Sequence, residues 1–439
     1  MRILLSELKN RLLKSKLFKD SFWAVFGNGL GNCLLLVAGI IIARFLGKDL
    51  YGEYGMVKTT MFHIASFSTL GLGFTSTKYI ADAVANAPGN LRSIIRTSIG
   101  TTFGFSLFLC ILLLLFANPL AIFIEEPGMA PAFRALGFII IFRAINTICA
   151  GVLAGYKSFK VVGVNSVIAG AVLLVSASIL TYKFGLVGSF IALALSQLVN
   201  ALLNFIAVFK EYNGTIDLHG GASITQDMLT FTIPVAIQEF FYMLSTWGGT
   251  MLLTKYASLG EVGLWSAAAQ WYAIIMFVPH LLLNVVLSYL SGVSREKNSH
   301  SLMLKKMLLI NLVCSFIPFA LVYSLAGFIS SFYGETFVGL STVIRVVTFS
   351  SVLTSLSNVF HSSLLAAGKN WLLLVLRAIR DVLMILALWI VLKNRIEHAS
   401  LAYAWIYVIA YVIYFILLTV SEIANKKKTP NRELGKETV

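Results

Sequence analysis

The sequence predicts an all-α polytopic membrane protein with about twelve transmembrane helices in two related halves. Of the 439 residues, 58% are hydrophobic and only 12% are charged, and the mean hydropathy is +0.86. Soluble domains carry about twice that share of charged residues, so most of this chain is expected to lie in lipid. Apolar runs near the roughly 20 residues that cross a bilayer recur from one end of the chain to the other.

The expected N-terminal lobe, residues 21–209, contains six spans, which lie at 22–45, 54–80, 93–117, 133–155, 163–183 and 186–209. A polar inter-lobe linker at 210–227 precedes the expected C-terminal lobe, residues 228–424. Its six spans lie at 228–255, 263–290, 303–330, 341–367, 371–392 and 400–423. A basic amphipathic segment at 1–20 is expected to lie on the membrane surface, and a basic tail occupies 425–439.

Two pairs of similar segments indicate an internal duplication. ARFLGKDLYGEYG at 43–55 is similar to TKYASLGEVGLWS at 254–266. LAGYKSF at 153–159 is similar to LAAGKNW at 365–371, which aligns Lys157 with Lys369. Both displacements are close to half of the chain length. A repeat on this scale predicts two bundles of the same topology.

Basic residues at the two ends predict that both termini are cytoplasmic. Six Lys or Arg residues precede the first span and five follow the last, and such flanks stay on the cytoplasmic side of a membrane. The formal net charge of +15 is spread over short loops and termini. Because these residues form no basic patch on a soluble domain, the charge argues against a nucleic acid partner.

The sequence lacks the motifs of several enzyme classes. It contains no HExxH, no GxxxxGK[ST] and no Asp-rich pair at a membrane edge that would hold a metal and a sugar diphosphate. Its four cysteines lie within apolar runs, without CxxC spacing. We therefore expect no catalytic residue, no metal site and no cofactor.

Three short segments carry a resemblance to a known family. They are FGNGLGN in the first span, ARFLGKDLYGEYG at 43–55 and GYKSFK at 155–160. Together with the basic start and the two six-span halves, they resemble the polysaccharide-exporter branch of the MOP superfamily, and within it the Wzx group of O-antigen flippases. The resemblance covers essentially the whole chain.

This resemblance implies two six-helix lobes around a central cavity that opens alternately to either side, as in the related MATE branch. The implied cargo is an undecaprenyl-diphosphate-linked oligosaccharide, which moves from the cytoplasmic to the outer leaflet of the bacterial inner membrane. The implied partners are this cargo, the membrane lipids, and a polysaccharide polymerase or other assembly proteins. A cationic, hydrated cavity would lower the barrier to moving such an anionic headgroup.

Basic residues inside the spans are therefore the candidates for cargo binding, because each costs roughly 2.5 to 3.5 kcal/mol at a helix centre unless it is paired or hydrated. Arg143 is the foremost, since it lies about 12 Å along its helix from the nearer end. A guanidinium there suits a diphosphate. The alternative is a structural ion pair, for example with Glu239.

Four further cations are candidates for lining the cavity. Arg377 and Arg380 share one helix face with Asp381, which is spaced to neutralise part of the charge of Arg377. Lys58 and Arg345 lie within roughly two turns of an outer end. For these four side chains, snorkelling to the membrane interface is the alternative.

Three titratable residues are candidates for ion coupling. Glu239 lies in mid-span, one turn after Pro234, where a carboxylate can carry a coupling proton. Asp381 and His280 are the other two. For Glu239 the alternatives are charge pairing with Arg143 or hydrogen bonding with Gln238 and neighbouring Asn residues, and for His280 a structural hydrogen bond.

The small residues and the aromatic set also have a structural interpretation. GxxxG spacings at 27–31, 100–104 and 151–155 predict close helix packing. An aromatic set could stack on sugars or form an interfacial belt; its members are Trp265, Trp271, Tyr272, Tyr403, Trp405 and Tyr407.

Two other functions stay open. A cation-coupled multidrug antiporter of the MATE branch would favour acidic residues in the cavity, whereas the first six spans contain Lys58 and Arg143 with no acid at comparable depth. A membrane enzyme of glycan assembly would need long loops or acidic metal-binding pairs, which are lacking. The positive charges inside the first six spans and the short loops therefore favour the flippase.

Overall fold

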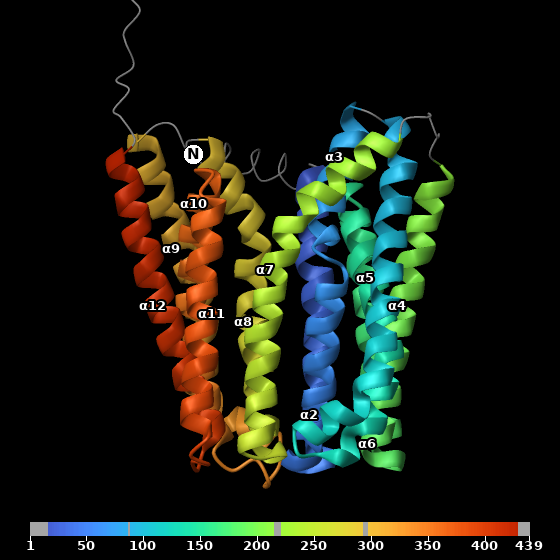
Figure 1. Cartoon of the computed structure of the whole chain (residues 1–439), viewed down its shortest axis with the longest axis vertical. Helices are drawn as coiled ribbons and strands as arrows, with labels where there is room; N and C mark the ends of the chain where they lie inside the picture. Colours follow the sequence, from blue (N-terminus) through green and yellow to red (C-terminus); the bar gives the residue numbers. More distant parts are fainter. Residues whose placement is uncertain (1–15, 87, 215–220, 293–296, 429–439) are drawn as a thin grey trace, which may run out of the picture. The chain divides into compact units, whose positions relative to one another are not determined.

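A computed structural model of the chain describes residues 16–86, 88–214, 221–292 and 297–428 (Figure 1). Over these residues it contains eleven α-helices, two short 3₁₀ segments and no strand, which confirms the predicted all-α class. The chain forms two compact units, Met1–Lys255 and Tyr256–Val439. Most of the amphipathic start, the middle of the linker and most of the basic tail lie outside the described residues.

The first unit contains six α-helices within its described residues: α2 (Lys16–Ser68), α3 (Leu72–Asn86), α4 (Leu91–Phe123), α5 (Ala130–Gly155), α6 (Phe159–Asn213) and α7 (Gly221–Tyr256). The short segments η1 (Pro88–Asn90) and η2 (Pro127–Met129) precede α4 and α5. The repeat in the sequence assigns α7 to the C-terminal lobe, and that lobe boundary stays a prediction.

Two glycines divide the longest helices. A continuous helix of 53 residues would be about 80 Å long, but Gly47 in α2 has φ 71° and Gly185 in α6 has φ 56°. Ser196 in the second half of α6 donates to the carbonyl of Ala169 in the first half over 2.9 Å. The halves of α6 are therefore antiparallel, and they match the spans expected at 163–183 and 186–209.

The span expected at 54–80 is wrong as a continuous helix. α2 ends at Ser68 and α3 begins at Leu72. Between them, Leu70 and Gly71 both have positive φ values of 51° and 76°, a conformation in which an α-helix cannot continue. Gly71 and Gly73 mark this stretch in the sequence, but the expected span continues through them.

Glycine contacts confirm two of the three predicted close packings. A Cβ at Gly27 would lie 2.7 Å from the Cα of Gly163, and a Cβ at Gly151 would lie 2.5 Å from the carbonyl oxygen of Gly73. By contrast, Gly100 and Gly104 have no such atom within 4 Å, so the packing predicted there is wrong. That pair occupies a spacing suited to a helix interface without forming one.

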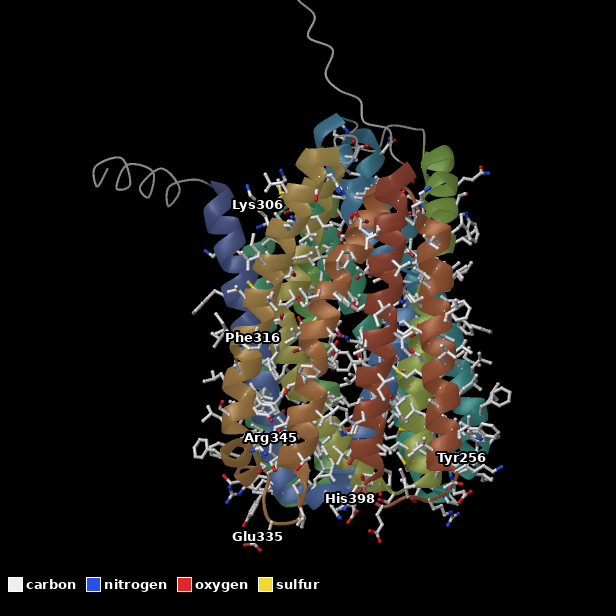
Figure 2. The ribbon with its side chains drawn as sticks, turned by 90° about the vertical axis from the view of Figure 1, so that its left-hand side faces the viewer. Tyr256, Lys306, Phe316, Glu335, Arg345 and His398 are labelled. Atoms are coloured by element: carbon white, nitrogen blue, oxygen red, sulfur yellow. The ribbon has the colours of Figure 1, made fainter. Side chains whose placement is uncertain are left out.

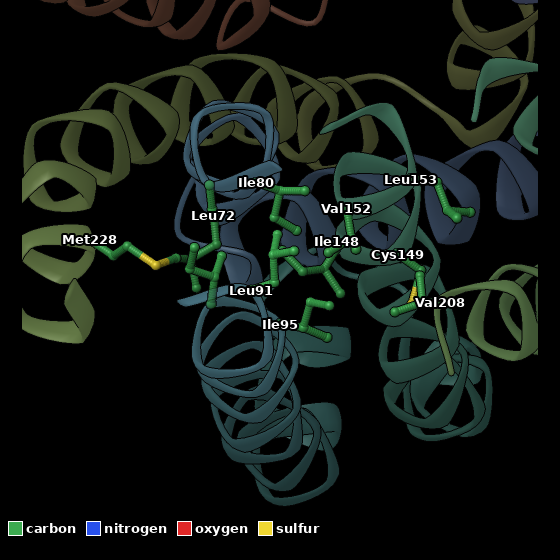
Figure 3. Close-up of a cluster of buried hydrophobic side chains, with 12 residues drawn as sticks. Leu72, Ile80, Leu91, Ile95, Ile148, Cys149, Val152, Leu153, Val208 and Met228 are labelled. Carbon is green, nitrogen blue, oxygen red and sulfur yellow. The ribbon is translucent and has the colours of Figure 1, made fainter. Parts of the chain in front are cut away.

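A buried apolar cluster joins α3, α4 and α5 in the first unit (Figure 3). Ile80 from α3, Ile95 from α4 and Ile148 from α5 are at most 1% exposed. Between helices in a membrane, side chains of this kind stabilise the contact through close van der Waals packing. The cluster therefore stabilises the short α3 against its two longer neighbours.

The second unit contains α8 (Leu259–Gly292), α9 (Lys297–Ser331), α10 (Leu340–Ala366), α11 (Asn370–Leu392) and α12 (Ala399–Lys428). α10 contacts α8, α9 and α12 and is the central helix of this unit. In Figure 2, Lys306 near the start of α9 lies at one end of this unit, while Glu335 and His398 lie at the opposite end.

The ends of α5 and α10 have the same hydrogen-bonded turn, which supports the internal repeat. After α5, the N–H groups of Lys157 and Ser158 donate to Ala154 and Leu153. After α10, those of Gly368 and Lys369 donate to Leu365 and Leu364. Lys157 and Gly368, 211 positions apart, both have positive φ. Lys157 thus corresponds to Gly368, one position from the partner Lys369 that the sequence alignment gave.

Eight of the described helices are long and apolar enough to cross a membrane, so the chain is a multi-pass membrane protein. Two of these, α2 and α6, are each divided by a glycine. α7 and α11 are of sufficient length, and α11 carries three charged residues in its middle. This arrangement is consistent with the expected count of about twelve spans.

Candidate functional site

One face of α2 in the first unit gathers three of the candidate residues. Lys58, Phe62 and Ser66 follow one another at intervals of four residues, which places them on one side of the helix. The guanidinium carbon of Arg143 lies 4.4 Å from the centroid of the Phe62 ring. Ser66 donates a hydrogen bond to Glu239 Oε2 over 3.3 Å. Lys58, Arg143 and Glu239 are therefore arranged along a single helix face.

Arg143 sits at the middle of α5 and is half-buried. The predicted alternative, an ion pair with Glu239, does not form in the described residues, and Glu239 Oε2 accepts a hydrogen bond from Ser66. No acidic side chain of the described residues pairs with Arg143. An aromatic ring attracts a cation through its face without accepting its N–H hydrogen bonds. The guanidinium donors of Arg143 thus keep their capacity for an anion.

Lys58 has a similar environment on the same face. Its Nζ lies 5.9 Å from the centroid of the Tyr54 ring, and within the part of the chain that the structure describes it pairs with no carboxylate. Tyr54 is 1% exposed, so the Lys58 ammonium lies over a buried ring. Lys58 and Arg143 are two cations near one helix face without an acidic partner.

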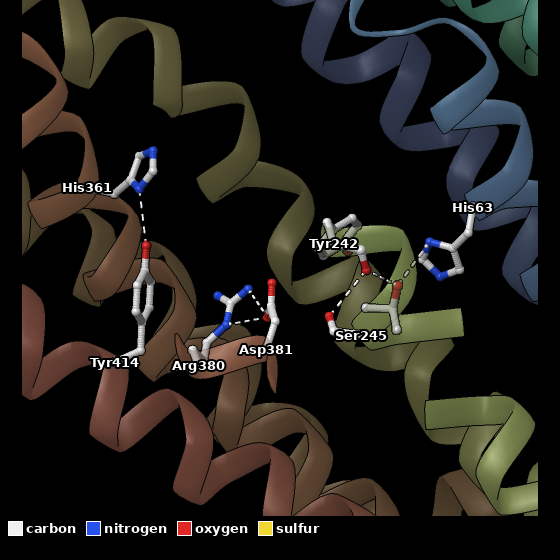
Figure 4. Close-up of polar contacts among 8 residues, drawn as sticks. His63, Tyr242, Ser245, His361, Arg380, Asp381 and Tyr414 are labelled. Atoms are coloured by element: carbon white, nitrogen blue, oxygen red, sulfur yellow. Dashed lines mark hydrogen bonds and ion pairs between the residues drawn. The ribbon is translucent and has the colours of Figure 1, made fainter. Parts of the chain in front are cut away.

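Side-chain hydrogen bonds join α7 to α2 and α3, a feature that the sequence did not reveal. Trp247 Nε1 donates to Thr60 over 3.0 Å, and Thr246 Oγ1 lies 3.2 Å from His63 Nδ1 (Figure 4). Thr232 and Thr75 hydroxyls lie 3.1 Å apart. Because later residues of α7 meet earlier residues of α2, the two helices run antiparallel, and Glu239 is one member of this polar seam.

In the second unit Arg380 is fully engaged. Its Nε and Nη2 donate to Asp381 Oδ1 over 2.8 and 2.6 Å, and its guanidinium carbon lies 4.8 Å from the Tyr411 ring and 4.7 Å from the Tyr414 ring. Figure 4 shows the ion pair beside Tyr414, whose hydroxyl lies 3.2 Å from His361 Nδ1. Arg380 and Asp381 are only 6% and 2% exposed.

The partner of Asp381 differs from the one that helical spacing suggests. The i, i+4 rule favours Arg377, whereas Oδ1 of Asp381 binds the adjacent Arg380. Asp381 Oδ2 is buried and accepts no hydrogen bond from the described residues. Arg377 lies one turn before Arg380 and is half-buried.

The remaining two candidates lie apart from these groups. Arg345, six residues into α10, has its guanidinium carbon 5.5 Å from the Tyr323 ring, and its Nε lies 3.5 Å from the Tyr323 carbonyl. That position near a helix end agrees with snorkelling. His280 is exposed, and it forms no hydrogen bond within the described residues.

The aromatic set of the second unit is largely occupied by its own contacts. Trp265 stacks on Tyr403 with ring centroids 3.9 Å apart, and Tyr407 contacts both Trp265 and Tyr272. Tyr403 and Tyr407 are 1% and 9% exposed, so neither presents a free face to a sugar. Trp405 is 50% exposed.

A family model described as "Polysaccharide biosynthesis protein" matches residues 17–291 of the chain. A "Putative O-antigen transporter" of Shigella flexneri is 20% identical over 362 residues, which are 81% of this chain and 86% of that protein. In the described residues, no group of three or more His, Cys, Asp or Glu side chains is placed to hold a metal ion.

Two solved structures have the same fold. An inward-facing multidrug resistance MATE family transporter of the MOP superfamily matches with a TM-score of 0.77 and 16% identity, covering 91% of this chain and 96% of that one. The lipid II flippase MurJ, in an inward closed conformation, matches with a TM-score of 0.71 and 17% identity, covering 94% and 90%. At 16% and 17% sequence identity, these two matches show a shared fold.

Proposed function

We propose, from the premise that this chain belongs to the polysaccharide biosynthesis protein family, that it is an alternating-access flippase. Its proposed cargo is an undecaprenyl-diphosphate-linked oligosaccharide, such as an O-antigen unit. It would move this cargo from the cytoplasmic to the outer leaflet of the bacterial inner membrane. The curated relative described as an O-antigen transporter supports this cargo class.

One observation carries the proposal: Arg143 and Lys58 lie near the same face of α2 and neither has an acidic partner in the described residues. A cation inside a membrane is costly unless an anion or water neutralises it. A diphosphate supplies the missing charge and accepts hydrogen bonds in the planar geometry that a guanidinium offers. The site therefore suits an anionic headgroup.

Phe62 has a supporting role in this proposal. Its ring holds the Arg143 guanidinium through a cation–π contact, worth about 0.5 to 2 kcal/mol, and takes none of its N–H donors. Lys58 adds a second positive charge, one turn before Phe62 on α2. Arg377 and Arg380 are the proposed cargo contacts of the second unit, and Arg380 pairs with Asp381.

Multidrug antiport is the second candidate, favoured by Glu239. This carboxylate, from α7, lies against the same face of α2 as Arg143 and accepts a hydrogen bond from Ser66. If the cargo were an organic cation, Glu239 would be its counterion, and in the flippase Glu239 is a candidate for ion coupling. The structural neighbour from the multidrug resistance MATE family has the same fold, so fold alone does not separate the two functions.

The basic ends of the chain support an orientation with both termini in the cytoplasm. In that orientation the end of the second unit near Lys306 faces the cytoplasm. A polymerase or another assembly protein would then receive the cargo on the opposite side. No step in this scheme requires a catalytic residue.

Reconstitution tests the proposal directly. Purified protein is placed in vesicles with a fluorescent undecaprenyl-diphosphate oligosaccharide on one leaflet, and the fraction of label that a membrane-impermeant quencher reaches is followed over time. Protein-dependent transfer of label supports the flippase. Exchange of organic cations without movement of the lipid-linked sugar would instead establish the antiporter and overturn the proposal.

A further inference from the structure

Two arginines lie at the start of α4 in the first unit, apart from the candidate site described above. Arg92 is the second residue of α4, and Arg96 follows one turn later. Arg92 is half-buried and Arg96 is exposed. Neither forms an ion pair with an acidic side chain of the described residues. Both guanidinium groups therefore remain available to an anion.

An aromatic ring holds the first of these arginines. The guanidinium carbon of Arg92 lies 4.8 Å from the centroid of the Tyr212 ring, and Tyr212 is the second-last residue of α6. The start of α4 thus lies beside the end of α6 (Figure 1). Because a ring attracts a cation through its face without accepting its N–H hydrogen bonds, Tyr212 orients Arg92 and leaves its donors to an anion.

Two phenylalanines continue this aromatic surface along α6. The ring centroids of Phe209 and Tyr212 are 6.5 Å apart, and those of Phe205 and Phe209 are 6.4 Å apart. Phe205 and Phe209 are 40% and 53% exposed. Exposed apolar rings on a helix of a membrane protein are suited to contact with lipid chains. A ladder of three rings therefore leads along α6 to the two arginines.

The same side of α4 is open beyond the arginines. Gly100 and Gly104 continue the four-residue spacing of Arg92 and Arg96, which places all four positions on one side of the helix. Both glycines are exposed, and a Cβ at either would meet no atom of the described residues within 4 Å. Phe103, at 46% exposed, borders them. An apolar surface without a partner helix thus adjoins the arginines.

We propose that this side of α4, from Arg92 to Gly104, binds an anionic phospholipid. The two arginines hold its phosphate, and one acyl chain lies over the two glycines. A guanidinium binds phosphate through two parallel hydrogen bonds, and basic residues at a membrane surface attract anionic headgroups. The basic ends of the chain orient this end of α4 toward the cytoplasm, and lipids of the cytoplasmic leaflet carry negative charge.

The charges around this surface favour a lipid over a second copy of the chain. From α3 to α6, the other charged side chains at this end are Lys78, Asp82, Lys157, Lys160, Lys210 and Glu211. Basic residues therefore outnumber acidic ones, and two parallel copies would bring like charges together. The surface needs neither the cargo nor its direction of movement, so it stands independently of the proposed flippase function.

Native mass spectrometry of the purified full-length protein tests the proposal, with micelles that contain equal amounts of phosphatidylglycerol and phosphatidylcholine. The wild type is expected to retain phosphatidylglycerol in preference. Arg92→Gln and Arg96→Gln should each weaken this retention about 5-fold, the factor for one basic residue at a membrane surface. Because Arg96 is exposed, its variant is informative even if Arg92→Gln fails to fold. Lys305→Gln, at an exposed lysine of α9, is the matched control and keeps the preference.

Gly100→Leu tests the contact with the acyl chain. It fills the open side of α4 without changing a charge, so retention of phosphatidylglycerol should fall, whereas Gly100→Ala should keep it. Equal retention of the two phospholipids by the wild type, or unchanged retention in the arginine variants, would overturn the proposal. A dimer in the same spectra that Gly100→Leu abolishes would assign this surface to a second copy. Inorganic phosphate retained in place of the lipid would assign the arginines to a free anion, which also contradicts the proposal.

Discussion

The guanidinium of Arg143 lies over the ring of Phe62, with 4.4 Å between its central carbon and the ring centroid. These residues come from α5 and α2, which are separated by α3 and α4 in the sequence. The contact holds a cation inside the first unit without neutralising it. This relationship places Arg143 at the centre of the proposed cargo site and makes Phe62 its positioning residue.

Replacing Phe62 should slow transport without removing the cation. Phe62→Leu loses the ring face and about 0.5 to 2 kcal/mol of attraction, which corresponds to a fall of roughly 2-fold to 30-fold in the initial translocation rate. Phe62→Tyr keeps the face and should retain most of the rate. The control is Phe103→Leu, at a ring that is 46% exposed on α4. Equal rates for Phe62→Leu and the control would contradict this role.

Separating Arg380 from Asp381 should destabilise the second unit. Asp381→Asn leaves the buried guanidinium without its countercharge, and the expected loss is about 3 to 5 kcal/mol of unfolding free energy. The double variant Arg380→Met, Asp381→Asn removes both charges and should lose much less. Thermal melting in detergent measures both, with the exposed Glu335→Gln as control. Additive losses in the double variant would show that the pair is not coupled.

The carboxylate of Glu261 caps a neighbouring helix. Its Oε2 accepts from the backbone N–H of Ser400 over 2.6 Å, at the second residue of α12. A negative charge at a helix N-terminus stabilises it, so Glu261→Gln should lower stability by about 1 kcal/mol. A melting curve of this variant is compared with that of Glu397→Gln, an exposed acid just before the same helix. No difference between them would exclude a capping role.

Two glycines with the same spacing motif should respond oppositely to alanine. Gly151→Ala would place a methyl group 2.5 Å from the Gly73 carbonyl oxygen, and overpacking of this kind costs about 1 to 3 kcal/mol. Gly100→Ala meets no atom within 4 Å and should be neutral or stabilising by up to about 1 kcal/mol. Melting temperatures of the two variants test this: that of Gly151→Ala should fall, and that of Gly100→Ala should stay the same or rise. Equal melting temperatures would mean that α3 and α5 separate easily.

Hydropathy was sufficient to predict the helical class, the multi-pass topology and most helix positions, because lipid imposes these on any sequence. The predicted resemblance to the polysaccharide-exporter branch of the MOP superfamily is confirmed by the family model, and the fold agrees with it. The span expected at 54–80 does not include the break at Leu70 and Gly71, where both residues have positive φ and the helix ends.

The candidate cations were found from their depth, but their partners were not. Asp381 binds the adjacent Arg380 where spacing favoured Arg377, because two tyrosines of α12 fix the guanidinium. The seam of α7 against α2 joins residues far apart in sequence. Its Thr, Ser and His residues are common in membrane helices, so only the folded structure distinguishes them.

The most direct test of the account is the translocation rate of Arg143→Gln in vesicles, measured with the fluorescent lipid-linked oligosaccharide at matched protein content. Arg134→Gln is the control, because Arg134 lies on the same helix, is exposed and donates to Asn118. The account predicts that Arg143→Gln abolishes transport while its melting temperature stays close to wild type, and that Arg134→Gln transports normally. Wild-type transport by the Arg143→Gln protein would contradict the central claim.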